Sequence, residues 1–194
     1  MVAGAIALKQ EDRLYTYDDY CTWDDDVRYE LIYGVPYVLE APSVRHQEVS
    51  VEFSRLISNY LKGKQCKVFH APIDVKPFPN KNNVVLQPDL LVVCDKSKIE
   101  SKFIVGAPDI VIEILSPSTA SKDRLVKYNI YMDAGVKEYW IVDADLNIVN
   151  VFKRQNGGYL AFAYGEEDII RSDVLEGLEI KLGEVFGVAE AEKG

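Results

Sequence analysis

Two carboxylates interrupt otherwise apolar segments in the middle of the chain. Glu113 lies inside the run IVIEIL, and Asp89 lies in QPDLLVV. A carboxylate buried among apolar residues costs several kcal/mol or takes up a proton, so each one needs a partner. If the two segments are neighbouring strands, the alternation of side chains lets Asp89 and Glu113 converge on one face. Such a pair can hold Mg²⁺ or Mn²⁺, with the backbone carbonyl of Ile114 and water completing the ligand shell.

The spacing of these residues is equally compatible with a structural role. In that interpretation, Asp89 ends a turn after Pro88, and Glu113 pairs with an arginine or a lysine. The residues alone do not choose between a cation site and an ordinary ion pair.

Segments of strand type dominate the chain. Residues 83–95 and 108–116, which carry the two carboxylates, are rich in β-branched residues and apolar on both faces, as central strands of a covered sheet are. Further segments with strand patterns cover residues 27–42, 66–78, 138–154, 158–172 and 175–187.

Two main helices are predicted beside these strands. The first begins at Ser43 and ends before Gly63, and the second spans residues 116–135 with Gly135 as its stop. The apolar stripe of the first helix consists of Val49, Phe53, Leu56, Ile57, Tyr60 and Leu61. The caps expected for the second helix are Ser118, Thr119 and Ser121.

This pattern predicts an α/β (α+β) fold with a central mixed β-sheet flanked by helices. We expect a single domain over residues 15–190, after a loosely ordered N-terminal segment at residues 1–14. The length of 194 residues suits one domain with a sizeable core.

Composition excludes several classes of protein. The net charge of -9 argues against a protein that holds nucleic acid through a broad basic patch, although it leaves a small metal-assisted site possible. The cysteines at positions 21, 66 and 94 are scattered and lack CxxC spacing, so we expect neither a disulfide framework nor a zinc site. No apolar stretch reaches the length of a membrane span, and we expect a cytoplasmic location.

Three segments in order carry a resemblance to a known family. QPDLLVV, GAPDIVIEILSPST and KDRLVKYNIYMDAGVKEYWIVD resemble the Uma-type restriction endonucleases, which belong to the PD-(D/E)XK nuclease superfamily. The resemblance runs from YELIYG near residue 29 to LEGLEIKLGEVF near residue 187. It implies a restriction-endonuclease-like fold that carries a Mg²⁺-dependent phosphodiesterase site.

The resemblance also implies catalytic residues. Asp89 matches the aspartate of the motif and Glu113 its second acidic residue. The lysine usual two residues later is replaced here by Leu115, and the family resemblance points to Lys127 of the following helix in its place. Asp123 lies four residues before Lys127, so a surface ion pair is the competing interpretation of that lysine.

Three further residues are possible accessory members of the site. Glu30 in YELIYG matches a family position and could add a carboxylate. His46 lies at the start of the first helix's apolar stripe, where a histidine is often a core or capping residue, and the family also has a histidine there. Gln87 lies two residues before Asp89, so it shares a strand face with it.

Together these features predict a metal-dependent endonuclease that hydrolyses phosphodiester bonds, with DNA as substrate and a homodimer as its assembly. The alternative is a catalytically silent nuclease fold that serves as a binding or assembly module. The convergence of Asp89, Glu113 and Lys127 distinguishes the two, because a Lys127 in solvent beside Asp123 would favour the silent fold.

Overall fold

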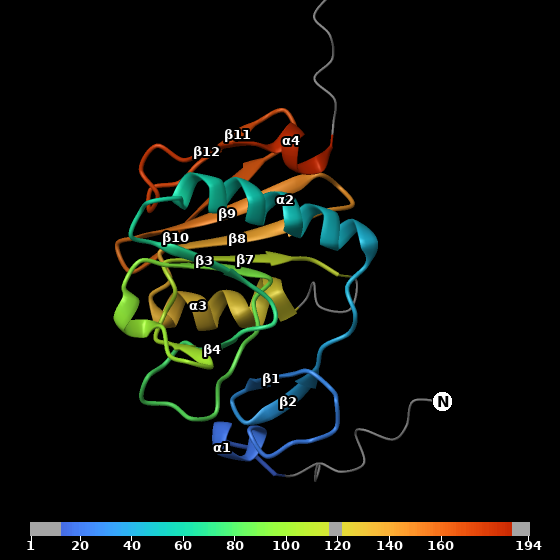
Figure 1. Cartoon of the computed structure of the whole chain (residues 1–194), viewed down its shortest axis with the longest axis vertical. Helices are drawn as coiled ribbons and strands as arrows, with labels where there is room; N and C mark the ends of the chain where they lie inside the picture. The colour runs from blue at the N-terminus through green and yellow to red at the C-terminus, as the bar shows by residue number, and fades with distance from the viewer. Residues whose placement is uncertain (1–12, 117–121, 188–194) are drawn as a thin grey trace, which may run out of the picture.

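A six-stranded mixed sheet forms the centre of the computed structural model, which describes residues 13–116 and 122–187 (Figure 1). The strand order is β10-β9-β8-β7-β5-β3, with β7 and β8 parallel and the other neighbours antiparallel. Its strands are β3 (Lys67–His70), β5 (Leu90–Val93), β7 (Ile110–Ile114), β8 (Glu138–Asp143), β9 (Ile148–Gln155) and β10 (Gly158–Tyr164). Every residue of β5 and β7 is buried, which confirms that these apolar segments are central strands.

Helices cover both faces of this sheet. α2 (Val44–Leu61) and α4 (Leu182–Phe186) lie on one face, and α3 (Tyr128–Ala134) lies on the other (Figure 1). Phe53 of α2 packs edge-on against Trp140 of β8, with ring centroids 6.1 Å apart. On the opposite face, Tyr131 of α3 packs on Tyr139 of β8 at 5.0 Å. Neighbouring residues of β8 thus bury opposite faces, and the predicted fold class is confirmed.

Helix α2 follows its sequence signals closely. The Ser43 side chain caps the helix by accepting a hydrogen bond from the backbone N–H of His46 (3.1 Å). The fully buried side chains of Val49, Phe53 and Ile57 recur every fourth residue and face the sheet. The cap therefore sets the first turn of the helix, and His46 belongs to that turn.

Three short sheets surround the central one. They are formed by β1 (Tyr29–Ile32) with β2 (Val35–Val38), β4 (Asp74–Lys76) with β6 (Phe103–Val105), and β11 (Ile169–Arg171) with β12 (Glu179–Lys181). The remaining elements are α1 (Tyr17–Tyr20), the 3-10 turn η2 (Lys96–Lys98) and the π-helical segment η3 (Lys122–Lys127). Segment 66–78, predicted as one strand, is split between β3 and β4. Pro72 lies at the split, where it has no N–H to donate to a strand ladder.

The expectation of no disulfide is wrong for one pair of cysteines. Cys66 and Cys94 are joined by a disulfide, while Cys21 is free and exposed. The antiparallel register of β3 and β5 pairs Lys67 with Val93, and this places the two cysteines opposite each other one residue beyond the pair. Because the two cysteines are 28 residues apart in the chain, their proximity could not be predicted from the sequence.

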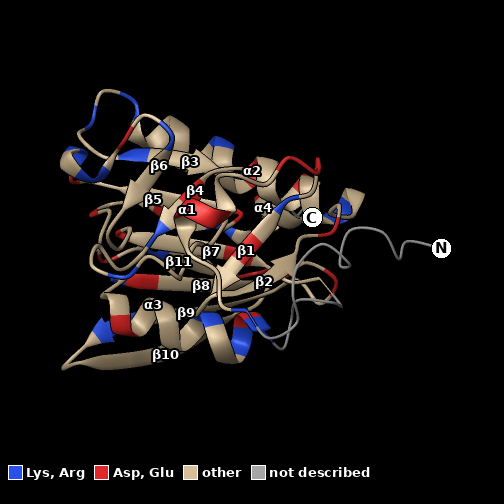
Figure 2. Cartoon of the chain, turned by 90° about the horizontal axis from the view of Figure 1, so that it is seen from below, with Lys and Arg blue, Asp and Glu red and all other residues tan. Residues whose placement is uncertain are grey.

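Some expectations fall outside the described residues. The N-terminal segment expected to be loosely ordered, residues 1–14, is described only at residues 13 and 14. The predicted caps Ser118, Thr119 and Ser121 also lie outside the described residues. No helix in the described part of the chain is long and apolar enough to cross a membrane. Figure 2 shows stretches of Lys and Arg in the loops beside β6, while both basic and acidic stretches occur on the other elements.

Candidate active site

The register of β5 and β7 brings the two motif carboxylates together. Leu90 of β5 pairs with Ile112 of the antiparallel β7. Asp89, one residue before Leu90, therefore lies opposite Glu113, one residue after Ile112. The Oδ2 atom of Asp89 accepts a hydrogen bond from the backbone N–H of Ile114 (2.8 Å). Asp89, Glu113 and Ile114 all line a cavity of about 190 Å³. The convergence predicted from strand alternation is what the structure contains.

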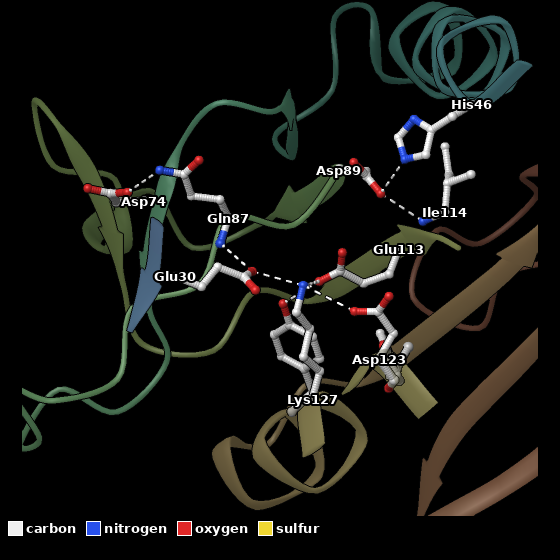
Figure 3. A network of polar contacts seen from close by, with 11 residues as sticks. Glu30, His46, Asp74, Gln87, Asp89, Glu113, Ile114, Asp123 and Lys127 are labelled. Atoms are coloured by element: carbon white, nitrogen blue, oxygen red, sulfur yellow. Dashed lines mark hydrogen bonds and ion pairs between the residues drawn. The ribbon is translucent and has the colours of Figure 1, made fainter. Parts of the chain in front are cut away.

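Lys127, at the end of the helical turn η3, lines the same cavity (Figure 3). Its Nζ atom lies 3.0 Å from Glu113 Oε1, 2.8 Å from Glu30 Oε1 and 3.2 Å from Asp123 Oδ1. The residue is 3% exposed, so the pair with Asp123 exists but is buried rather than a surface pair. Asp123 and Lys127 both belong to the π-helical turn η3, and π-helical turns occur frequently at functional sites.

The charges around Lys127 do not balance. Burial raises the pKa of Glu113 well above its usual range, and the charges of Asp123, Asp89 and Glu30 add to this effect while Lys127 opposes it. Burial also lowers the pKa of Lys127, but the three carboxylates outweigh it and leave that pKa well above the usual range. Lys127 therefore stays protonated, and the surplus of carboxylates favours a further cation beside them.

Glu30 and Gln87 belong to the same network. Glu30 is fully buried, and its Oε1 atom accepts a hydrogen bond from the backbone N–H of Gln87 (3.0 Å). Gln87 lines the cavity, but its side-chain amide donates to Asp74 Oδ1 (3.0 Å) and to the Tyr20 hydroxyl (3.1 Å), away from Asp89 (Figure 3). Glu30 Oε2 and Gln87 Oε1 are buried and accept no hydrogen bond from the described residues.

His46 lies at the opposite wall of the cavity and contacts Asp89. Its Nε2 atom is 3.2 Å from Asp89 Oδ2 and donates to that carboxylate. Burial lowers the pKa of His46, but the hydrogen bond and charge of Asp89 outweigh it, so the net pKa is raised. With the Ile114 N–H on the same oxygen, this contact fixes how the Asp89 carboxylate points.

Two buried tyrosines also support the site. The buried Tyr131 hydroxyl donates to Glu113 Oε1 (2.8 Å), and the Tyr139 hydroxyl donates to the carbonyl of Asp123 (3.0 Å). Tyr131 follows Lys127 by four residues, which places both on one face of a helix. This spacing could have indicated from the sequence that Tyr131 lies near Lys127. Tyr139 lies in β8, and no sequence spacing connects it to the site.

The donor set fits a hard divalent cation. No group of three or more His, Cys, Asp and Glu side chains within the described residues is arranged to hold a metal ion by itself. Mg²⁺, however, commonly uses one or two carboxylates, with carbonyls and waters as its other ligands. Asp89 Oδ2 and Glu113 Oε1 carry the hydrogen bonds described above, which leaves one oxygen of each carboxylate for a cation. The Ile114 carbonyl lies on the same side of β7 as its N–H, which points at Asp89.

Comparison with known proteins places the chain in a family. The family model Uma2, described as "Putative restriction endonuclease", matches residues 15–183. This chain belongs to the Uma2 family. The match covers all the residues of the candidate site and the three motifs, so the resemblance to this family is confirmed.

Relatives of this Uma2 chain support the fold. A crystal structure from Anabaena variabilis, described as "a putative nuclease belonging to DUF820", superposes with a TM-score of 0.72 over 89% of this chain and 98% of that one, at 20% identity. Two proteins of Synechocystis sp., both named as uncharacterized, are 27% and 25% identical over 155 and 117 residues. These matches cover 78% and 59% of this chain, and 80% and 65% of the relatives. The superposition shows that this chain shares the fold of the Anabaena protein.

Proposed function

We propose that this Uma2-family protein is a metal-dependent endonuclease that hydrolyses phosphodiester bonds in DNA. The observation that carries the proposal is the convergence of Asp89, Glu113 and a buried Lys127 on one cavity. A silent fold would have no need to keep a lysine among three carboxylates at the edge of an open cavity, because buried ion pairs contribute little to stability.

Asp89, Glu113 and the Ile114 carbonyl are the residues that would hold Mg²⁺ or Mn²⁺. Such an ion, when bound, polarises the scissile phosphate and lowers the pKa of a coordinated water. His46 and the Ile114 N–H orient Asp89 through its Oδ2 atom, and Tyr131 orients Glu113 through Oε1.

Lys127 supplies positive charge at the edge of the same cavity. Its ammonium group is held in place by Glu113, Glu30 and Asp123, so its positive charge is fixed beside the position where a phosphate would develop negative charge. Leu115, at the position of the usual motif lysine, packs instead into the apolar cluster with Tyr131 and Ile130. The ammonium group therefore comes from the helix, which supports the expectation that Lys127 replaces the missing lysine.

Two active centres, one facing each strand, allow both strands of a duplex to be cut in one binding event. A homodimer is therefore part of this proposal, with one active centre for each strand.

The test combines metal binding with cleavage. We expect the wild-type protein to bind Mg²⁺ or Mn²⁺ in calorimetry and to cut DNA, and Glu113→Gln to lose both, with cleavage at least about a hundredfold slower. Glu48→Gln, an exposed glutamate of α2, removes the same charge outside the site and should behave as wild type. Metal binding without cleavage of any nucleic acid would favour the silent binding module, and full activity of Glu113→Gln would refute the assigned site.

A further inference from the structure

A second cavity continues from the proposed active centre along helix α2. Its volume is about 500 Å³, and it shares Gln47, Ala71 and Asp89 with the cavity around Glu113. We refer to it as the α2 groove. Along the helix it extends from Gln47 to Asn59, which at 1.5 Å per residue is roughly 18 Å. Because the two cavities share a wall, a ligand in the groove would lead directly to Asp89.

The side chains of the α2 groove offer mainly hydrogen-bond donors. Ser50, Ser54 and Ser58 repeat every fourth residue, so their hydroxyls form a row along one side of the helix. Arg55 lies beside this row, and its Nε and Nη2 atoms are held by Glu52, which does not line the groove. Among the described residues that line the groove, the one carboxylate is Asp89, at the inner end. Such a surface suits an anionic ligand better than a cationic one.

The lining also indicates which part of a nucleic acid would bind. No Phe, Tyr or Trp is among the described residues that line the groove. His70, whose Nδ1 atom contacts the carbonyl of Ala71, is the one ring among them, so the groove offers bases little stacking surface. Hydroxyl, amide and guanidinium groups are the usual contacts of phosphate and sugar, and these contacts position a strand without reading its sequence.

We propose that the α2 groove binds the sugar–phosphate backbone of one nucleic acid strand on one side of the bond to be cleaved. This inference rests on the proposed function, because the strand is the substrate of the same active centre. Arg55 is the one permanent positive charge among the described residues that line the groove, so we expect the affinity to depend weakly on salt and binding to show little sequence preference.

The first test places a negative charge at the far end of the groove. Ser58 is exposed and about three helical turns from Gln47, so Ser58→Glu should fold normally. The affinity for a fluorescein-labelled single-stranded DNA of about 12 nucleotides is measured by anisotropy in EDTA, where no metal-dependent cleavage occurs. We expect Ser58→Glu to weaken binding about tenfold through like-charge repulsion. Gln155→Glu, at the exposed end of β9, adds the same charge away from the groove and should bind as wild type does.

A second pair of variants removes a positive charge instead. Arg55→Gln should weaken binding and reduce the slope of log affinity against log salt by about 0.7, the value for one phosphate contact on a single strand. Lys62→Gln removes one charge from the exposed C-terminal cap of the same helix and should leave the slope unchanged.

The outcomes separate this inference from the proposed function. Absence of DNA binding by the wild-type protein, or equal binding by Ser58→Glu, Arg55→Gln and their controls, would overturn the groove as a strand site. The binding assay in EDTA does not depend on turnover. A protein that binds through the groove but never cleaves DNA would therefore refute the proposed function alone.

Discussion

At the scale of single residues, Lys127 explains why an apolar strand carries Glu113. The two form a buried ion pair, and Tyr131 adds a hydrogen bond to the same carboxylate oxygen. Desolvating two charges consumes much of the attraction between them, so the pair contributes less to stability than its distance suggests. Removing one partner has a larger effect, because the other charge is then left buried without compensation.

We therefore expect Lys127→Met to lower the free energy of unfolding by about 3–5 kcal/mol, measured by urea denaturation in EDTA. Lys67→Met replaces an exposed lysine of β3 and should change the free energy of unfolding by less than about 0.5 kcal/mol. Adding Glu113→Gln to Lys127→Met should restore part of the loss, because it removes one of the three carboxylates that lost their cation. Equal stability of the two lysine variants would contradict the buried ion-pair network.

At the scale of elements, the start of α2 and the ends of β5 and β7 build one wall of the active centre. The Ser43 cap sets the first turn of the helix, and that turn holds His46 against Asp89. The register of β5 and β7 sets the height of Asp89 relative to Glu113. A register shifted by one residue would turn one carboxylate to the opposite face of the sheet, so pairing of the strands decides whether a site exists.

The cap can be tested with little disturbance of the core, because Ser43 is exposed. Ser43→Ala leaves the His46 N–H without its side-chain acceptor and should reduce the free energy of unfolding by about 1 kcal/mol. Ser43→Asp retains an acceptor and should remain close to wild type. Thermal or urea unfolding measures the stability of the wild type and the two variants. An equal loss of stability in both variants would argue against a capping role.

At the scale of the whole molecule, the Cys66–Cys94 disulfide constrains the central sheet far from the active centre. It ties the beginning of β3 to the end of β5, whereas His70 and Asp89 lie at the opposite ends of these strands. The cross-link closes a loop with a separation of 28 residues, which reduces the conformational freedom of the unfolded chain.

Loss of this cross-link should lower the free energy of unfolding by roughly 3–4 kcal/mol. The comparison uses the double variant Cys66→Ser, Cys94→Ser and the wild-type protein in urea. Cys21→Ser removes the exposed free thiol and should have no measurable effect. Titration of unreduced, denatured protein should detect one thiol, and a count of three would show that the bond is absent.

Most strands, helix α2 and the pairing of Asp89 with Glu113 were accessible from the sequence, whereas the helix predicted over residues 116–135 is, among its described residues, α-helical only over Tyr128–Ala134 and follows a π-helical turn. Their signals are local: apolar periodicity, a serine cap, glycine stops and the alternation of side chains along a strand. Membership of the family followed from the order of three motifs rather than from any single residue.

The sequence by itself determined which residues carry charge and which face of each element is apolar. The tertiary structure decided what those charges meet: Lys127 turned inward against Glu30 and Glu113, Tyr139 held the turn that carries Asp123, and Cys66 met Cys94. It also joined the α2 groove to the active centre through Gln47, Ala71 and Asp89. The physical reason is that such contacts join residues far apart in the chain, and strand register and helix packing bring them within a few ångströms only after the sheet has formed.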